Sequence, residues 1–360
     1  MVRIHVVNSV KGGCGKSTWC LLLADYLRAT GAQPYIIDLD IHGTSWYSEY
    51  EKYFEADKKS FVFINDLTED VLKALGHRYI MQLKISREVP LPTGETTYNL
   101  PICVADPSRA DSIHEEQLDI FEHVVFKIIE HIINNNDSKE DGGYNKIDII
   151  LDMPPGYEPH AEKIINHLLF DINSPLTHFL KKRNDKISNQ SHKAMEKRLE
   201  ESPQIPIDVS KEDKINDWLH AEEYKIYFYM MSGIIYSGAT LNAQYIKRLW
   251  NNQTYSNNTN EALPAENIMF VLNDLTDQVV HLGDKNTFDN IIKMLEQTIK
   301  SELDSKPIQF AVLSYLTEIS ELERRIRRYS AEENSGAFEL NASTLNEFKN
   351  RIASFFQPKD

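Results

Sequence analysis

Short apolar runs alternate with longer amphipathic stretches along most of this chain. The apolar runs predict buried strands at residues 4–8, 35–40, 100–105, 147–153, 225–231, 267–273 and 308–313. Helical patterns follow them, the clearest at 17–28 and 115–133. Apolar strands separated by helices are typical of a mostly parallel sheet that is covered by helices on both faces. We therefore predict a doubly wound α/β fold, whose ligands bind at the carboxyl ends of the strands.

The strand pattern continues through the chain, so we predict a single domain over residues 1–360. A polar stretch at 160–223 interrupts the pattern, with a charged run at 181–183 and breaks at Pro203 and Pro206. This composition predicts a helical insertion between two strands rather than a separate core. No internal repeat is visible, which argues against a duplicated two-site protein.

The charge balance and the cysteines exclude several classes of protein function. The chain has 39 basic and 54 acidic residues and a formal net charge of −15, which excludes a protein that wraps nucleic acid over its whole surface but leaves a local basic patch open. Cys14, Cys20 and Cys103 form no C-x-x-C pair, so we expect a reducing compartment and no disulfide scaffold, zinc ribbon or cysteine-ligated cluster within one chain. No signal peptide or membrane-spanning run is visible, and we expect a cytoplasmic protein.

The strongest chemical signal is the segment Lys11-Gly12-Gly13-Cys14-Gly15-Lys16-Ser17-Thr18, which follows a predicted strand and opens a predicted helix. Its glycines let successive backbone N–H groups turn toward phosphate oxygens, and the N-terminus of the helix adds a positive dipole end. In such a loop we expect Lys16 to reach the β- and γ-phosphates, Ser17 to ligate Mg²⁺ and Thr18 to hydrogen-bond the α-phosphate. The segment therefore predicts a binding site for a nucleotide and Mg²⁺.

The pattern K-G-G-x-G-K-S-T resembles the deviant Walker A motif of the ParA/MinD family of ATPases. The resemblance implies that the chain binds and hydrolyses Mg·ATP as a homodimer in which ATP bridges the two subunits. It also implies a catalytic role for both lysines, Lys16 within its own subunit and Lys11 across the interface, on the phosphates that the partner binds. Val10 stands where MinD and Mrp proteins usually have glycine, so the chain resembles the ParA type more closely.

Two carboxylates end the strand predicted at 35–40. The run Ile36-Ile37-Asp38-Leu39-Asp40 resembles the family segment in which the first Asp supports the Mg²⁺ shell and the second positions the attacking water. The resemblance thus implies a metal role for Asp38 and a catalytic role for Asp40, the two functions that phosphoryl transfer requires. The chain continues with Ile41-His42 where the family usually has Pro-Gln, and the alternative is that both carboxylates cap the next element.

Two later strand ends carry further polar side chains. The strand at 147–153 contains Asp152 and leads into Pro154-Pro155-Gly156, which resembles the Walker B segment of the family. The resemblance implies that Asp152 holds Mg²⁺ through water, in line with the preference of hard cations for oxygen. Asn273 ends the strand at 267–273, where the family commonly has an Asn whose amide reads the adenine edge. A turn-forming role for Asn273 is an equally open alternative.

The sequence leaves open which molecule recognises the nucleotide-bound state of the protein. ParA-type proteins bind DNA through basic residues, and a predicted helix carries Arg324, Arg325, Arg327 and Arg328. These arginines suit either DNA phosphates or a solvated helix face with internal ion pairs. MinD-type proteins end in a membrane-binding helix, but the apolar stripe at 345–356 has sparse basic charge, so packing on the sheet is favoured. The polar insertion is the candidate docking site for an adaptor or stimulating protein.

Iron–sulfur carriers of the family need bridging cysteines downstream of the phosphate loop. Only Cys103 is a candidate there, and its apolar strand indicates a buried structural thiol. We therefore predict a ParA-like ATPase that dimerises with Mg·ATP, turns over slowly without a stimulating partner, and acts as a nucleotide switch in DNA partitioning or positioning. The alternatives are a protein-interaction switch that docks a dedicated partner through the insertion, and a MinD-like membrane-associated switch.

Overall fold

The computed structural model of the chain describes most of the predicted elements. The described residues are 1–41, 45–55, 61–67, 79–106, 118–137, 146–171, 173–186, 189, 224–232, 236–254, 267–272, 285–303, 309–312, 337–340 and 342–356. Three predicted features lie outside them: Asn273, residues 190–223 of the insertion predicted at 160–223, and the cluster Arg324, Arg325, Arg327 and Arg328.

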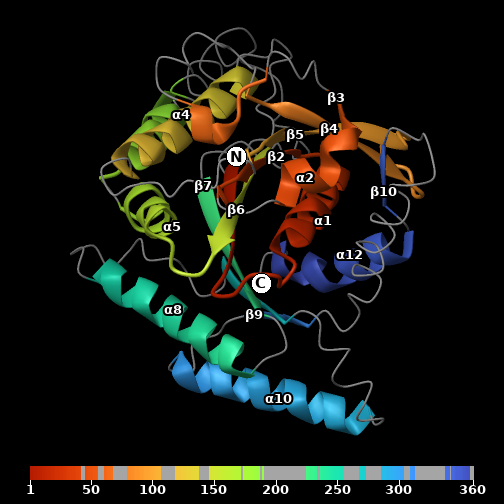
Figure 1. The fold of residues 1–360 in the computed structure, drawn as a ribbon, viewed down its shortest axis with the longest axis vertical. Coiled ribbons are helices and arrows are strands. Elements are labelled where there is room, and N and C mark those ends of the chain that lie inside the picture. The colour runs from red at the N-terminus through yellow and green to blue at the C-terminus, as the bar shows by residue number, and fades with distance from the viewer. Residues whose placement is uncertain are drawn as a thin grey trace, which may run out of the picture.

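A single mixed sheet forms the centre of the described structure. Its strands are β1 (Val2–Ser9), β2 (Gln33–Asp38), β3 (Phe54–Glu55), β4 (Met81–Arg87), β5 (Thr97–Cys103), β6 (Ile147–Pro155), β7 (Tyr224–Ser232), β8 (Ile268–Leu272), β9 (Gln309–Val312) and β10 (Phe338–Leu340). The described strands form a 10-stranded sheet in the order β10-β4-β5-β2-β6-β1-β7-β8-β9, with β3 paired to β4 (Figure 1). Only β3–β4 and β4–β5 pair antiparallel among the described strands. The predicted mostly parallel sheet is confirmed, and β3, β4 and β10 extend it at one edge.

Helices cover both faces of this sheet (Figure 1). They are α1 (Lys16–Ala29), α2 (Ser45–Tyr50), α4 (Leu118–Asp137), α5 (Pro159–Lys163), α8 (Tyr236–Thr254), α10 (Lys285–Glu302) and α12 (Ala342–Phe356), with short turns η1 (Glu51–Tyr53), η2 (Ile64–Asp66) and the π-helical η4 (Ile164–Leu169). One core cluster, the α1 cluster, contains the apolar sides of α1, α2 and α12. The other, the α4 cluster, contains those of α4, α5, α8 and α10. The doubly wound architecture predicted from the sequence is therefore confirmed. Residues 175–186 are also helical, and they bury Leu176 and Leu180 in the α4 cluster.

The burial of each strand reflects its place in the sheet. Every residue of β8 is buried, and so is all of β6 except Pro155, because helices cover both faces of a central parallel strand. β4 instead alternates buried and half-buried positions, which suits a strand near the edge. β1 lies between β6 and β7, so the glycine-rich segment that follows it leaves the sheet at its centre.

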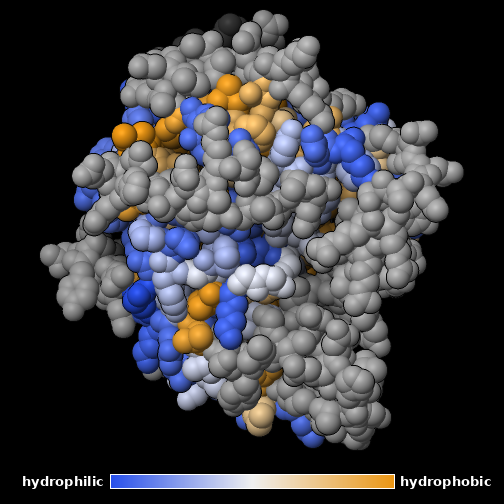
Figure 2. Space-filling view, viewed as in Figure 1, coloured by the Kyte–Doolittle hydropathy of each residue, from blue (hydrophilic) through white to orange (hydrophobic). Residues whose placement is uncertain are grey.

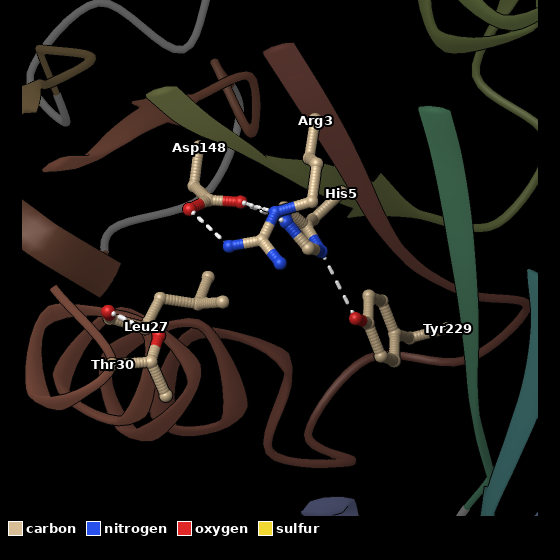
Figure 3. Close-up of polar contacts among 6 residues, drawn as sticks. All are labelled: Arg3, His5, Leu27, Thr30, Asp148 and Tyr229. Atoms are coloured by element: carbon tan, nitrogen blue, oxygen red, sulfur yellow. Dashed lines mark hydrogen bonds and ion pairs between the residues drawn. The ribbon is translucent and has the colours of Figure 1, made fainter. Parts of the chain in front are cut away.

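A buried polar network crosses β1, β6 and β7 (Figure 3). The Arg3 guanidinium donates to both oxygens of Asp148, from Nε to Oδ1 at 2.6 Å and from Nη2 to Oδ2 at 2.7 Å. His5 Nε2 lies 2.8 Å from Asp148 Oδ1, and His5 Nδ1 lies 3.0 Å from the Tyr229 hydroxyl. Burial alone would raise the pKa of Asp148, but the hydrogen bond of His5 and the charge and hydrogen bonds of Arg3 hold that pKa below its ordinary value.

The ionised Asp148 determines the tautomer of His5. An ionised carboxylate only accepts hydrogen bonds, so His5 donates to it from Nε2. The neutral ring then accepts at Nδ1, where Tyr229 donates its hydroxyl proton. Burial is the main reason that the pKa of His5 lies below its ordinary value. The fold therefore holds His5 as a neutral bridge between a donor and an acceptor.

α12 covers one side of this network. The Arg3 guanidinium carbon lies 5.6 Å from the centroid of the Phe356 ring, and His5 packs edge-on against the same ring at 5.9 Å. The helix also buries Leu345, Phe348, Ile352 and Phe355 in the α1 cluster. The predicted packing of this helix on the sheet is confirmed. Among the described helices, none combines the length and the apolar character that crossing a bilayer requires.

The neutral state of His5 predicts a loss of stability on mild acidification. In the unfolded chain the imidazole has its ordinary pKa of 6.5, so below that pH the unfolded state binds a proton that the fold excludes. The free energy of unfolding should therefore fall with falling pH, by at most about 1.4 kcal/mol per pH unit from this group. His5→Gln keeps an N–H for Asp148 and an oxygen for Tyr229 but does not titrate.

Denaturant unfolding of the wild type and His5→Gln between about pH 7 and about pH 5 checks this expectation. The wild-type stability should decline more steeply with acid than the stability of the variant. Parallel declines would show that the ring is protonated in the fold, and would contradict the assigned tautomer.

Candidate nucleotide-binding site

The glycine-rich segment forms a tight turn between β1 and α1. Gly13 and Gly15 have φ angles of 72° and 81°, in the left-handed region that favours glycine. The Ser9 hydroxyl closes the turn, because it donates to the Lys11 carbonyl at 2.6 Å and accepts from the Lys11 N–H at 3.1 Å. Residues 11–13 are exposed, and α1 begins with the buried Lys16. The loop backbone therefore lies open to a ligand at the N-terminus of a helix.

Neighbouring elements anchor the start of this loop. Just beyond β6, the Gly156 N–H donates to the Ser9 carbonyl at 2.9 Å. From α8, Asn242 accepts from the Val10 N–H at 3.1 Å and donates to the Met231 carbonyl of β7 at 2.8 Å. Asn242 was not predicted from the sequence, and it lies 232 residues from Val10 along the chain. Its amide ties the loop to the end of the adjacent strand.

The two strand-end acids meet beside the loop. Asp38, the last residue of β2, is the register partner of Asp152, which lies three residues before the end of β6. The Ser17 hydroxyl donates to Asp152 Oδ2 at 2.6 Å, and the Trp46 indole N–H donates to the same oxygen at 2.8 Å. The other oxygen, Oδ1, is buried and has no hydrogen-bond partner among the described residues. The contact from Trp46 was not predicted from the sequence.

The two carboxylate oxygens of Asp38 accept hydrogen bonds from backbone N–H groups rather than from side chains. The N–H groups of Asp40 and Ala105 donate to its two oxygens at 3.1 Å and 3.4 Å. Even so, burial and then the charges of Asp152 and Asp40 raise the pKa of Asp38 well above its ordinary value. Burial also raises the pKa of Asp152. Two adjacent buried carboxylates resist full ionisation unless a positive charge joins them.

This group of donors fits Mg²⁺. The cation prefers oxygen ligands, and Asp152 Oδ1 is a buried carboxylate oxygen that no described residue satisfies. The Ser17 oxygen keeps lone pairs for a metal while its proton is donated to Asp152. A divalent cation would also offset the charge of the adjacent acids. Ser17 and Asp152, with Asp38 beside them, would therefore hold Mg²⁺ next to the phosphates of a nucleotide.

The other predicted site residues take different places. Lys11 is exposed on the loop, Thr18 is buried in the first turn of α1, and Asp40 is half-buried beyond the end of β2. Cys14 is buried, and its thiol donates to the Lys11 carbonyl at 3.3 Å. Burial raises the pKa of this thiol, so Cys14 supports the loop as a neutral group.

On the face shown in Figure 2, the described residues across the centre are mostly hydrophilic, and hydrophobic side chains gather mainly toward the top of the view.

Comparison with known proteins gives one family match and several structural similarities. Residues 1–59 match the family model described as ParA: NUBPL iron-transfer P-loop NTPase. A search of curated proteins found no significant match. Among solved structures, the chain is similar to apo McdA from Cyanothece, with a TM-score of 0.49 and 10% identity over 99% of this chain and 100% of that one.

Two MinD structures are similar over comparable lengths. The MinD cell division protein of Aquifex aeolicus has a TM-score of 0.44 and 13% identity, with 99% of each chain covered. MinD of Pyrococcus horikoshii, complexed with Mg-ADP, has a TM-score of 0.40 and 14% identity, with 98% of this chain and 96% of that one covered.

The matched segment contains the elements that carry the loop. It runs through β1, α1 and β2, and so includes Lys16, Ser17 and Asp38. The sheet then places Asp152 of β6 beside Asp38. The similarity to P-loop NTPases of the ParA type is therefore found over residues 1–59, the segment that carries the loop.

Proposed function

We propose that this protein is a Mg²⁺-dependent ATPase of the ParA type, whose switch is the association of two copies through bound ATP. The arrangement around Asp152 carries the proposal. One of its oxygens takes the Ser17 hydroxyl, and the other has no partner among the described residues, beside an exposed glycine loop. These features together suit a magnesium-bound phosphate group.

Each residue of the site has its own task in this proposal. The loop N–H groups and the N-terminus of α1 bind phosphate oxygens, and the buried Lys16 adds a positive charge. Mg²⁺, when bound, neutralises phosphate charge and orients the phosphates. Asp40 orients the attacking water. Lys11, exposed on the loop, supplies a positive charge to the phosphates held by the second copy.

An iron-transfer role, which the description of the matching family model names, receives little support from the cysteines. All three cysteines of this chain, Cys14, Cys20 and Cys103, are buried, with 5% exposure or less. Burial raises the pKa of each thiol, which disfavours the thiolate that binds iron. The nucleotide switch is therefore the function that we propose.

For the cellular role we propose DNA partitioning or positioning. The candidate phosphate contacts are Arg324, Arg325, Arg327 and Arg328, which rest on the sequence because they lie outside the described residues. The alternative is that an adaptor protein docks on the insertion at 160–223 and recognises the ATP-bound state. The packing of α12 in the α1 cluster weighs against a MinD-like membrane switch, because its apolar stripe is already covered.

Lys16→Ala and Lys11→Ala should fail at different steps. Lys16→Ala removes a buried charge beside the phosphates and should weaken ATP binding by about ten- to a hundred-fold. Lys11→Ala should leave ATP binding unchanged but abolish hydrolysis and the ATP-dependent dimer. Fluorescent-ATP titration, phosphate release and gel filtration with ATP separate these effects. Wild-type hydrolysis by Lys11→Ala would show that the bridging role of this lysine is wrong.

Gly13→Ala and Gly94→Ala form a matched pair. Both glycines have positive φ angles, 72° and 89°, and an added Cβ at either would meet no atom within 4 Å. Each alanine should lower stability by about 1–2 kcal/mol through backbone strain. Only Gly13 lies in the loop, so only Gly13→Ala should weaken nucleotide binding in the same titration. Equal nucleotide affinities of the two variants would contradict phosphate binding by the loop.

DNA binding tests the proposed cellular role. Asp40→Ala should trap the ATP state, because the attacking water is no longer oriented. With ATP but not ADP, this variant should co-sediment with random-sequence duplex DNA, and added salt should release it. Replacement of the four arginines by alanine should abolish the binding. An ATP dimer on gel filtration without DNA binding would leave the ATPase intact and assign the cellular role to a protein partner.

A further inference from the structure

Trp46 is the least expected residue of the site. It lies on α2, its side chain is fully buried, and its indole N–H donates to Asp152 Oδ2 at 2.8 Å. The Ser17 hydroxyl donates to the same oxygen at 2.6 Å. One carboxylate oxygen thus accepts two donors, while the other accepts none from the described residues.

This uneven sharing selects one orientation of the carboxylate. The terminal torsion of an Asp side chain has a broad distribution, so a carboxylate without donors can rotate and turn its oxygens away from a ligand. Here the donors come from two separate elements, Ser17 from α1 and Trp46 from α2. Together they hold Oδ2, so that Oδ1 is the oxygen left for a cation or for water bound to it.

Aromatic packing supports the position of the indole. The Trp46 ring lies 5.2 Å from the Tyr50 ring, and Tyr50 packs edge-on against Phe338 of β10 at 5.3 Å. Tyr53 packs against the same phenylalanine at 5.8 Å. Aromatic pairs of this kind contribute stability beyond their buried area. The edge of the sheet therefore supports α2 and, through it, the indole N–H.

Burial of an indole does not by itself explain this hydrogen bond. Trp19 on α1 is also buried, and its Nε1 has no hydrogen-bond partner among the described residues. The fold thus accommodates one indole N–H without such a partner, whereas the N–H of Trp46 is directed to a site carboxylate.

We infer that Trp46 is a positioning residue of the Mg²⁺ site, whose N–H orients Asp152 so that Oδ1 receives the cation or its water. Trp46 acts through the carboxylate and is not itself a ligand. Outer partners of metal ligands typically change metal affinity by about 10- to 100-fold. The inference rests on the proposed function, since it assigns a task within that Mg²⁺ site.

Trp46→Phe tests the inference, because it keeps an aromatic ring and removes the N–H. Trp19→Phe is the matched control at a buried indole without the hydrogen bond, and Asp152→Asn removes the charge itself. The readout is the Mg²⁺ concentration at which fluorescent ADP reaches half of its Mg²⁺-dependent gain in affinity. We expect Trp46→Phe to raise this midpoint about ten-fold and to leave ADP affinity in chelator unchanged. Trp19→Phe should leave both quantities at their wild-type values.

An isosteric analogue separates the N–H from packing. β-(3-benzothienyl)alanine at position 46 keeps the size of the ring system and replaces the N–H by sulfur. It should reproduce the shift of Trp46→Phe while unfolding at the wild-type temperature. A wild-type Mg²⁺ midpoint for the analogue would overturn the inference, even where Trp46→Phe shifts it. Two results would contradict the proposed function, and the inference with it. One is a wild-type ADP affinity that does not depend on Mg²⁺, and the other is an Asp152→Asn variant with the wild-type Mg²⁺ midpoint.

Discussion

The register between β1 and β6 is the constraint on which the site depends. Near the amino end of β1, Arg3 lies opposite Asp148, and the two form a buried bidentate pair. Beyond its carboxyl end, the loop leads to Ser17, whose hydroxyl reaches Asp152 on the same neighbouring strand. A slip of one residue would move Arg3 to the other face of the sheet and leave the charge of Asp148 buried without its partner, at a cost of about 3–5 kcal/mol. The polar network at one end of the strand thereby secures the geometry at the other end, where the loop begins.

The site itself opposes the stability of the fold. Asp38 and Asp152 are buried side by side, and burial raises the pKa of both carboxyls. Protein donors satisfy three of the four oxygens, two on Asp38 and one on Asp152, and the remaining one is Asp152 Oδ1. A buried polar atom without a partner costs about 1–3 kcal/mol. A cation that arrives with a nucleotide would remove this cost, so the arrangement links ligand binding to stability in the same atoms. Such a penalty is expected where a protein keeps an oxygen ready for a ligand.

Prediction from the sequence succeeded where the site is contiguous with a strand. The glycine loop, Asp38 and Asp152 each lie at the end of an apolar run, and parallel strands bring such ends to one edge. Asn242 and Trp46 carry no such signal, because each contributes a single donor from a helix whose sequence is otherwise ordinary. Three strands were also missed for physical reasons. β4 alternates apolar and polar residues instead of forming an apolar run. β3, with 2 residues, and β10, with 3 residues, are too short to show a period.

β10 and Trp46, neither of which was predicted from the sequence, are connected by aromatic packing. β10 pairs with β4 at the edge of the sheet and presents Phe338 to Tyr50, which in turn packs against Trp46. The helix that follows β10 ends in Phe356, which covers Arg3 at the start of β1. The C-terminal part of the chain thus supports both the start of β1 and the indole that donates to Asp152. Contacts so distant in sequence carry a large loop-closure entropy cost, so they require the rest of the fold. Residues 1–59, which carry the family signature, therefore depend on the C-terminal elements for the geometry that the signature implies.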